Sequence, residues 1–269
     1  MTNNYNISII IPGIRPQNWS KVTDSIDASI GEYSYEVIFV GPYPLPVNLE
    51  TDRGVKYVKD FGTPMRCSNI GGLLATGELI TWGSDDGIYT ENSLKKTLDT
   101  FYNLEKNNKN IITCKYFEGE GYSGETDTKS FLVKNDNYKI NKAYPGATNV
   151  PNNWWILNVG IMYRSYFEEL GGWDCNFQSC PLGHADMAIR AQADGAKVYL
   201  SSLPMLNCDH MSGTSGDHAP IHHAQLGPDK EYYLKKYYNI DLEELTVNID
   251  INNWKQAAPV WKERFTDID

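Results

Sequence analysis

The sequence has 269 residues, an ordinary globular composition and a formal net charge of −10 at pH 7. This length suits one large domain or two small ones and is enough to bury a hydrophobic core. The negative charge argues against broad binding to nucleic acid or anionic lipid, since both need a basic surface.

No apolar run approaches the length that is needed to span a bilayer. The N-terminal residues lack the basic and apolar regions of a signal peptide, so we expect a cytoplasmic protein. The five cysteines are loosely spaced, which favours free thiols in a reducing compartment. A zinc site on Cys175, Cys180 and Cys208 is an alternative, although no paired C-x-x-C knuckle is present.

Strand and helix patterns alternate through the first ~115 residues. The predicted strands are residues 7–12, 35–40, 55–58, 79–82 and 111–116. Between them, apolar residues recur at helical spacing. Three helices are predicted: one ends at Gly31, the second spans residues 64–76, and the third follows a cap at Thr90. This alternation predicts a doubly wound, mostly parallel α/β sheet.

The middle of the chain, residues 117–151, is rich in glycine and polar residues and predicts loops and short strands over a binding face. Beyond it we expect strands at 154–163 and 197–200, and helices at 165–170, 183–193 and 229–238. Trp254, Trp261 and Phe265 follow near the C-terminus, and we expect this aromatic extension to dock on the body.

Two adjacent carboxylates, Asp85 and Asp86, follow the apolar run at 79–82. Parallel α/β sheets bind ligands just past the carboxyl ends of their strands. Carboxylates there are hard oxygen ligands that suit Mg²⁺ or Mn²⁺, and the ion in turn can hold a diphosphate. The alternative is a polar Asp-Asp-Gly turn that only closes the strand.

With these residues in view, the chain resembles the family 2 glycosyltransferases of the GT-A fold over roughly residues 7–210. The stretches that carry the resemblance are the strand at 7–12, RCSNIGG (66–72), ATGELI (75–80), SDD (84–86), NVGIMYR (158–164), FEELGGWD (167–174) and GHAD (183–186), followed by Ile189, Arg190 and Gly195. Their order and spacing together are more specific than any one of them. The resemblance implies an inverting, metal-dependent transferase that uses a nucleotide-diphosphate sugar, with a UDP-sugar as the expected donor.

The resemblance also implies site residues and an organisation of the chain. Metal ligands would be Asp85, Asp86 and His210, and the catalytic base would be Asp186. Donor contacts are expected from Pro12, Arg15, Gly41, Tyr43, Arg66, Asn69, Ser84 and Asp85. Acceptor contacts are expected from Trp154, Trp155, Trp173, Asp174, His184 and Arg190. We expect the chain to divide into a nucleotide-sugar half (1–116), an acceptor and catalytic half (117–225) and a C-terminal extension (226–269).

The chemistry of glycosyl transfer agrees with such an arrangement. The diphosphate leaving group gains negative charge, which a divalent cation can stabilise as a Lewis acid. A separate carboxylate must take the proton of the attacking hydroxyl, which belongs to a glycan, another hydroxyl acceptor or a modified nucleobase. Asp186 and Arg190 are four residues apart on a predicted helix and share a face. A structural ion pair is the alternative role for these two residues, and Asp174 is the rival base.

Several features depart from the family pattern or allow other functions. Gly41-Pro42-Tyr43 stands where the family keeps acidic residues for the nucleotide base, so Tyr43 is a candidate for stacking instead. Gly83 and Ala185 replace two further acids. A nucleotidyltransferase of similar fold needs a glycine-rich phosphate loop, and residues 12–16 contain too little glycine. A catalytically inactive sugar-binding module and a zinc hydrolase built on His218 and His222 are the remaining alternatives.

Overall fold

The computed structural model describes residues 4–49, 54–119, 131–133, 135–209 and 218–257. The strands within these ranges are β1 (Tyr5–Pro12), β2 (Tyr35–Gly41), β3 (Val55–Lys59), β4 (Gly77–Trp82), β5 (Gly87–Tyr89), β6 (Asn110–Gly119), β7 (Phe131–Leu132), β8 (Gly160–Tyr163) and β9 (Lys197–Asp209). In the described chain they form one sheet in the order β3-β2-β1-β4-β8-β6-β9-β5, with β7 added to β6.

Most of the main ladder is parallel. β1 pairs in parallel with β2 and β4, β2 with β3, and β6 with β9. β8 runs antiparallel between β4 and β6, and the short β5 is antiparallel to β9. The predicted mostly parallel α/β sheet is therefore confirmed, with one antiparallel strand inserted at its centre.

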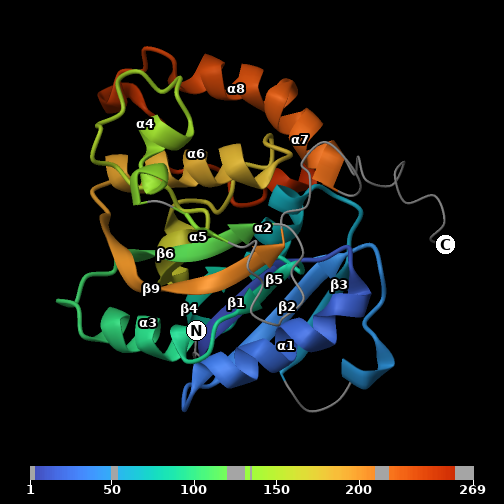
Figure 1. Cartoon of the computed structure of the whole chain (residues 1–269). Coiled ribbons are helices and arrows are strands. Elements are labelled where there is room, and N and C mark those ends of the chain that lie inside the picture. The colour runs from blue at the N-terminus through green and yellow to red at the C-terminus, as the bar shows by residue number, and fades with distance from the viewer. Residues whose placement is uncertain (1–3, 50–53, 120–130, 134, 210–217, 258–269) are drawn as a thin grey trace.

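Helices cover both faces of this sheet (Figure 1). They are α1 (Pro16–Ile30), α2 (Pro64–Leu74), α3 (Ser93–Tyr102), α4 (Ile140–Ala143), α5 (Arg164–Glu169), α6 (Cys180–Ala193), α7 (Ala219–Leu226) and α8 (Pro228–Tyr237). α1 and α3 pack on one face, while α2, α5 and α6 pack on the other and α8 lies outside α6. Within the described ranges, none of these helices has the length and apolar character to cross a membrane.

Local sequence explains the two helices that flank β1. In α1 the buried stripe is Trp19, Val22 and Ile26, which recur at helical spacing, and the helix ends at Gly31 with φ of +64°.

α2 lies close to its neighbours because its contact face carries glycine. A Cβ atom on Gly72 would come within 2.5 Å of Phe167, so a side chain there would push α2 away from α5.

The second half of the chain differs in detail from the prediction. Only Gly160–Tyr163 of the expected 154–163 strand pairs in the sheet. β9 continues to Asp209, well past the predicted 197–200. Thr90 does not cap α3, because its hydroxyl donates to the Pro204 carbonyl at 2.6 Å and Asn92 occupies the N-cap position instead.

The described part of the C-terminal extension contacts the body of the domain. The Asn69 side-chain amide donates to the Ile251 carbonyl at 3.0 Å, and the Cys175 amide donates to Asn253 at 2.8 Å. Trp254 packs against the main core. Trp261 and Phe265 lie outside the described residues.

Candidate active site

A cavity of about 770 Å³ opens past the carboxyl ends of β1, β2 and β4. Pro12 and Gly41, which end β1 and β2, line it, and so do Gly83 to Asp86 after β4. This is the position where a doubly wound sheet leaves a crevice, because the helices that follow neighbouring strands turn to opposite faces. The volume lies in the range of small-molecule sites.

Asp85 anchors the loop after β1. Its carboxylate accepts hydrogen bonds from the amides of Ile14 (2.7 Å) and Arg15 (2.5 Å) and from the Trp19 indole (3.1 Å). The Arg15 guanidinium adds a 2.5 Å ion pair. Burial raises the pKa of Asp85, and the positive charge of Arg15 opposes this effect. Asp85 is only 1 % exposed, so its oxygens are directed into the protein.

Asp86 also lines the cavity and meets two basic side chains. The His218 ring nitrogen Nε2 lies 2.9 Å from Asp86 Oδ2, and Arg15 Nη2 lies 3.6 Å from the same oxygen. Arg15 Nη2 is also 3.2 Å from His218 Nε2. Because one imidazole nitrogen cannot both donate to Asp86 and accept from Arg15, the carboxylate contact implies the tautomer with hydrogen on Nε2.

These contacts bear on the predicted metal site. Asp85 accepts hydrogen bonds from the β1 loop, and the cationic Arg15 contacts both carboxylates. Among the described residues no group of three or more His, Cys, Asp or Glu side chains is arranged to hold a metal ion. The third predicted ligand, His210, lies outside the described residues. The described side chains therefore do not fit a Mn²⁺ or Mg²⁺ ion here.

The predicted donor residues divide into two groups. The cavity is lined by Pro12, Arg15, Gly41, Ser84 and Asp85. Tyr43, Arg66 and Asn69 are not among the residues that line it.

Arg66 and Asn69 instead hold the C-terminal extension. Arg66 forms an ion pair with Asp60 at 2.9 Å and donates to the Ala257 carbonyl at 2.9 Å, with its guanidinium over the Trp254 ring. Asn69 is fully buried and accepts from the Trp173 amide at 3.1 Å. Both side chains therefore make long-range structural bonds, and their predicted donor contacts stay predictions.

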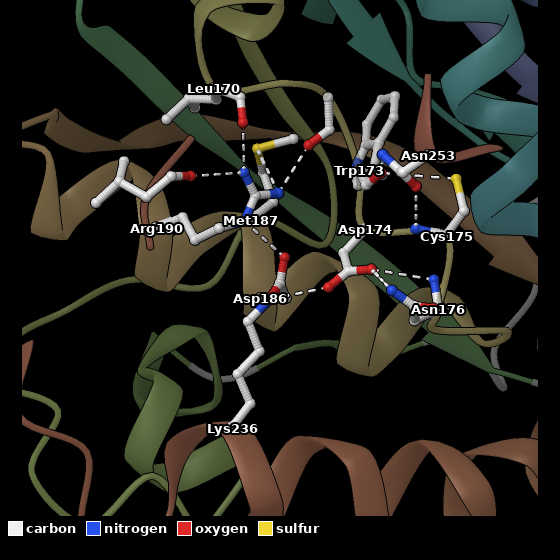
Figure 2. Close-up of polar contacts among 12 residues, drawn as sticks. Leu170, Trp173, Asp174, Cys175, Asn176, Asp186, Met187, Arg190, Lys236 and Asn253 are labelled. Atoms are coloured by element: carbon white, nitrogen blue, oxygen red, sulfur yellow. Dashed lines mark hydrogen bonds and ion pairs between the residues drawn. The ribbon is translucent and has the colours of Figure 1, made fainter. Parts of the chain in front are cut away.

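Asp186 is fully buried and is not among the residues that line the cavity; it belongs to the polar network that Figure 2 shows. One oxygen accepts from Arg190 Nε at 2.8 Å, and the other accepts from Lys236 Nζ and the Tyr237 hydroxyl, both at 2.6 Å. Burial alone would raise the pKa of Asp186, yet the charges of Arg190 and Lys236 outweigh it and lower this pKa to about 2. The carboxylate is thus ionised at neutral pH, and its role as the base stays a prediction.

Asp174 and Arg190 belong to the same network. Asp174 accepts from Lys236 and from Tyr232, each at 2.9 Å. Arg190 is fully buried and donates to the carbonyls of Leu170 and Gly172 at 2.8 and 2.7 Å, as Figure 2 shows in part. Two carboxylates and two cations balance here, and they join α6 and α8. Asp174 and Arg190 are thus engaged in this network, and their acceptor contacts, like the base role of Asp186, stay predictions.

Only His184 among the predicted acceptor residues lines the cavity. Burial lowers the pKa of its imidazole to about 3, so the ring is neutral. Trp173 is fully buried and meets Trp82 edge-on, with ring centroids 5.1 Å apart. Trp154 and Trp155 pack against the core, and Trp155 lies beside Lys139. The three tryptophans with predicted acceptor contacts are therefore not among the residues that line the cavity.

Sequence reasoning missed several cavity residues. They are Tyr116, Glu118, Lys142, Tyr144 and Asn158. His218 and His222, which the sequence offered for a zinc site, also line the cavity. Tyr116 and Glu118 are two apart on one strand, so their shared face could have been read from the sequence. The others come from loops and short helices whose position depends on the tertiary fold.

The sequence matches no protein-family model, and it matches no curated protein significantly. The fold is similar to that of S. aureus TarS, at 12% identity. The structure of TarS 1–349 with UDP has a TM-score of 0.53 and covers 86% of this chain and 70% of that chain. The structure of the complex with UDP-GlcNAc has a TM-score of 0.52 and covers 80% of this chain and 60% of that chain. A third TarS structure has a TM-score of 0.52. The match covers 76% of this chain and 37% of that chain, so this chain spans well under half of it. At this identity the likeness shows the fold, which is GT-A, and leaves the activity open.

Proposed function

We propose that this protein transfers a sugar from a nucleotide-diphosphate sugar to a hydroxyl group of an acceptor. The observation that carries the proposal is the cavity of about 770 Å³ at the carboxyl ends of β1, β2 and β4, with Asp85, Asp86 and Arg15 at its wall. The shared GT-A fold supports it, because similar structures are those of TarS with UDP and UDP-GlcNAc. A UDP-sugar is therefore the first donor to test.

The residues suggest how a donor would lie. The backbone at Pro12 and Gly41 borders the end of the cavity between β1 and β2, where the nucleoside is proposed to bind. Arg15 and His218 are the basic groups beside Asp86, and we place the diphosphate against them. Arg15 would then stabilise the charge that grows on the leaving diphosphate.

Inversion at the anomeric carbon is part of the proposal. A single displacement requires one proton acceptor and no enzyme nucleophile, and it leaves the product with the opposite anomeric configuration. The anomeric configuration of the product can be measured by NMR. No step is assigned to a divalent ion, since the described donor set does not fit one. The acceptor is a glycan or another hydroxyl compound.

The proposal is tested by screening nucleotide sugars for binding by calorimetry and for hydrolysis. We expect the parent to bind UDP and at least one UDP-sugar, and Arg15→Gln to lose about tenfold or more of this affinity. Asp24→Asn, at an exposed position on α1, is the matched surface control and should bind like the parent. If the folded parent binds no nucleoside diphosphate and no nucleotide sugar, the proposed function is wrong.

A further inference from the structure

Two buried polar side chains on the cavity wall have hydrogen-bonding capacity that the protein itself does not use. His184, on α6, and Tyr116, on β6, both line the cavity, and each is only 7 % exposed. Burying a polar group costs free energy unless it is hydrogen-bonded. Such side chains on a cavity wall therefore indicate a ligand whose own polar groups complete them.

The imidazole of His184 has no hydrogen-bond partner within the ranges that the structure describes. Its ring nitrogens are not among the completely covered polar atoms that lack a partner, so they are accessible from the cavity that the residue lines. Burial lowers the pKa of this ring to about 3, and the neutral ring has one donor and one acceptor nitrogen. His184 can thus bind an uncharged hydroxyl group with either nitrogen.

The hydroxyl group of Tyr116 is a second donor at the wall. Its oxygen accepts a hydrogen bond from the Asn158 side-chain amide at 2.9 Å, and the Tyr116 backbone amide donates to the Tyr138 hydroxyl at 2.9 Å. These bonds hold the ring in place and leave its hydroxyl hydrogen without an acceptor in the described chain. Tyr116 is thus positioned to donate to a bound molecule.

Trp82, the last residue of β4, connects these two side chains along one wall of the cavity. Its indole N–H donates to the Asn158 carbonyl at 3.0 Å, and its ring centroid lies 6.0 Å from that of His184. Trp82 and Asn158 line the cavity as well. We call His184, Trp82, Asn158 and Tyr116 the Trp82 wall.

The Trp82 wall lies beside the proposed diphosphate position. Three residues separate Trp82 from Asp86 in the chain, and all of them line the cavity. In the sheet β4 lies between β1, whose Pro12 borders the proposed nucleoside position, and β8. β8 is antiparallel to β4, so Asn158, just before β8, lies at the carboxyl end of β4 on the side away from β1. A sugar that is bonded to a diphosphate at Asp86 and directed away from the nucleoside therefore meets this wall.

We propose that the Trp82 wall is the subsite for the sugar of the nucleotide sugar. His184 and Tyr116 each bind one hydroxyl group of this sugar. A site that hydrogen-bonds a hydroxyl group rejects an analogue that lacks it, because the buried partner is then left unpaired. The two residues therefore determine which sugars the protein accepts. The inference rests on the proposed function and adds to it the residues that recognise the transferred group.

The test compares two dissociation constants, measured by calorimetry on the full chain. One is for UDP, and the other is for whichever of UDP-glucose, UDP-galactose and UDP-GlcNAc the parent binds most tightly. His184→Phe and Tyr116→Phe remove the polar groups and keep an aromatic ring. Each should weaken binding of the UDP-sugar by about three- to tenfold, the usual worth of one hydrogen bond, and leave the affinity for UDP unchanged.

The comparison with UDP separates sugar recognition from a structural role, because a distorted cavity would bind both ligands less tightly. His223→Phe on α7 and Tyr238→Phe directly after α8 are the matched controls, since both residues are exposed and neither lines the cavity. They should change neither dissociation constant.

Monodeoxy analogues of the same UDP-sugar identify the hydroxyl groups concerned. For each of the two residues, one analogue should bind the parent less tightly, yet bind the Phe variant as tightly as the complete UDP-sugar does, because the analogue and the variant lack the same hydrogen bond.

UDP-sugar affinity equal to that of the parent in either Phe variant overturns the assignment of that residue. An equal loss of UDP and UDP-sugar affinity overturns it too, and so does a parent that binds UDP but none of the three UDP-sugars. These outcomes leave nucleotide binding intact, whereas the proposed function falls if the parent binds no nucleoside diphosphate and no nucleotide sugar.

Discussion

The substitution Asp186→Asn separates a structural role of this carboxylate from a catalytic one. Asp186 is fully buried, and its partners Arg190 and Lys236 are 2.8 and 2.6 Å away. Asparagine keeps the shape and removes the negative charge that balances the two cations. Removing one partner of a buried charge network is strongly destabilising, because the remaining charges stay buried without compensation.

The pKa indicates the order of magnitude of the effect. The folded pKa of Asp186 is about 2 against an ordinary value of 3.8, a difference that corresponds to about 2 kcal/mol of stability. Because the folded value is depressed, this contribution is present above the ordinary pKa and is lost as the pH falls through about 2. The cost of the uncompensated cations adds to it, so we expect Asp186→Asn to lose about 2 to 4 kcal/mol at neutral pH.

Urea unfolding followed by tryptophan fluorescence measures this loss. A decrease of this size lowers the melting temperature by roughly 5 to 15 °C in a chain of this length. Asp99→Asn is the control. It removes the charge of a half-buried i,i+4 pair with Lys95 on α3 but keeps an oxygen for the Tyr33 hydroxyl, so it should change the urea midpoint little. An Asp186→Asn variant that is as stable as the parent but inactive in transfer would refute this reasoning and restore Asp186 as the base.

Two further predictions concern the C-terminal extension and the metal. Arg66→Ala removes the ion pair with Asp60 and the bond to the Ala257 carbonyl, so we expect a loss of about 1 to 3 kcal/mol and faster proteolysis at the C-terminal end. Its UDP affinity should match that of the parent, and a large loss of affinity would return Arg66 to the donor site. The protein without nucleotide should melt at the same temperature in EDTA and in Mn²⁺, and a clear stabilisation by Mn²⁺ would show that a metal site forms after all.

Local patterns in the sequence were sufficient for the first half of the fold. Runs such as Ile7–Ile11 are apolar on both faces, which suits a parallel strand covered by helices on each side. The place of Asp85 and Asp86 at the end of β4 follows from the same pattern. The antiparallel insertion of β8 could not be predicted from such a pattern. Four residues with strand character carry no information about which neighbour they pair with.

The orientation of the candidate site was decided by tertiary structure. His184 and Asp186 are two residues apart on α6, so they point about 200° away from each other, and only packing decides which of them faces the cavity. The buried network with α8 holds Asp186 on the inner side and leaves His184 at the wall. Glu118 lies two strands from Gly87 because β9 lies between β6 and β5. Such strand order depends on contacts between segments about ninety residues apart in the chain, which no local periodicity encodes.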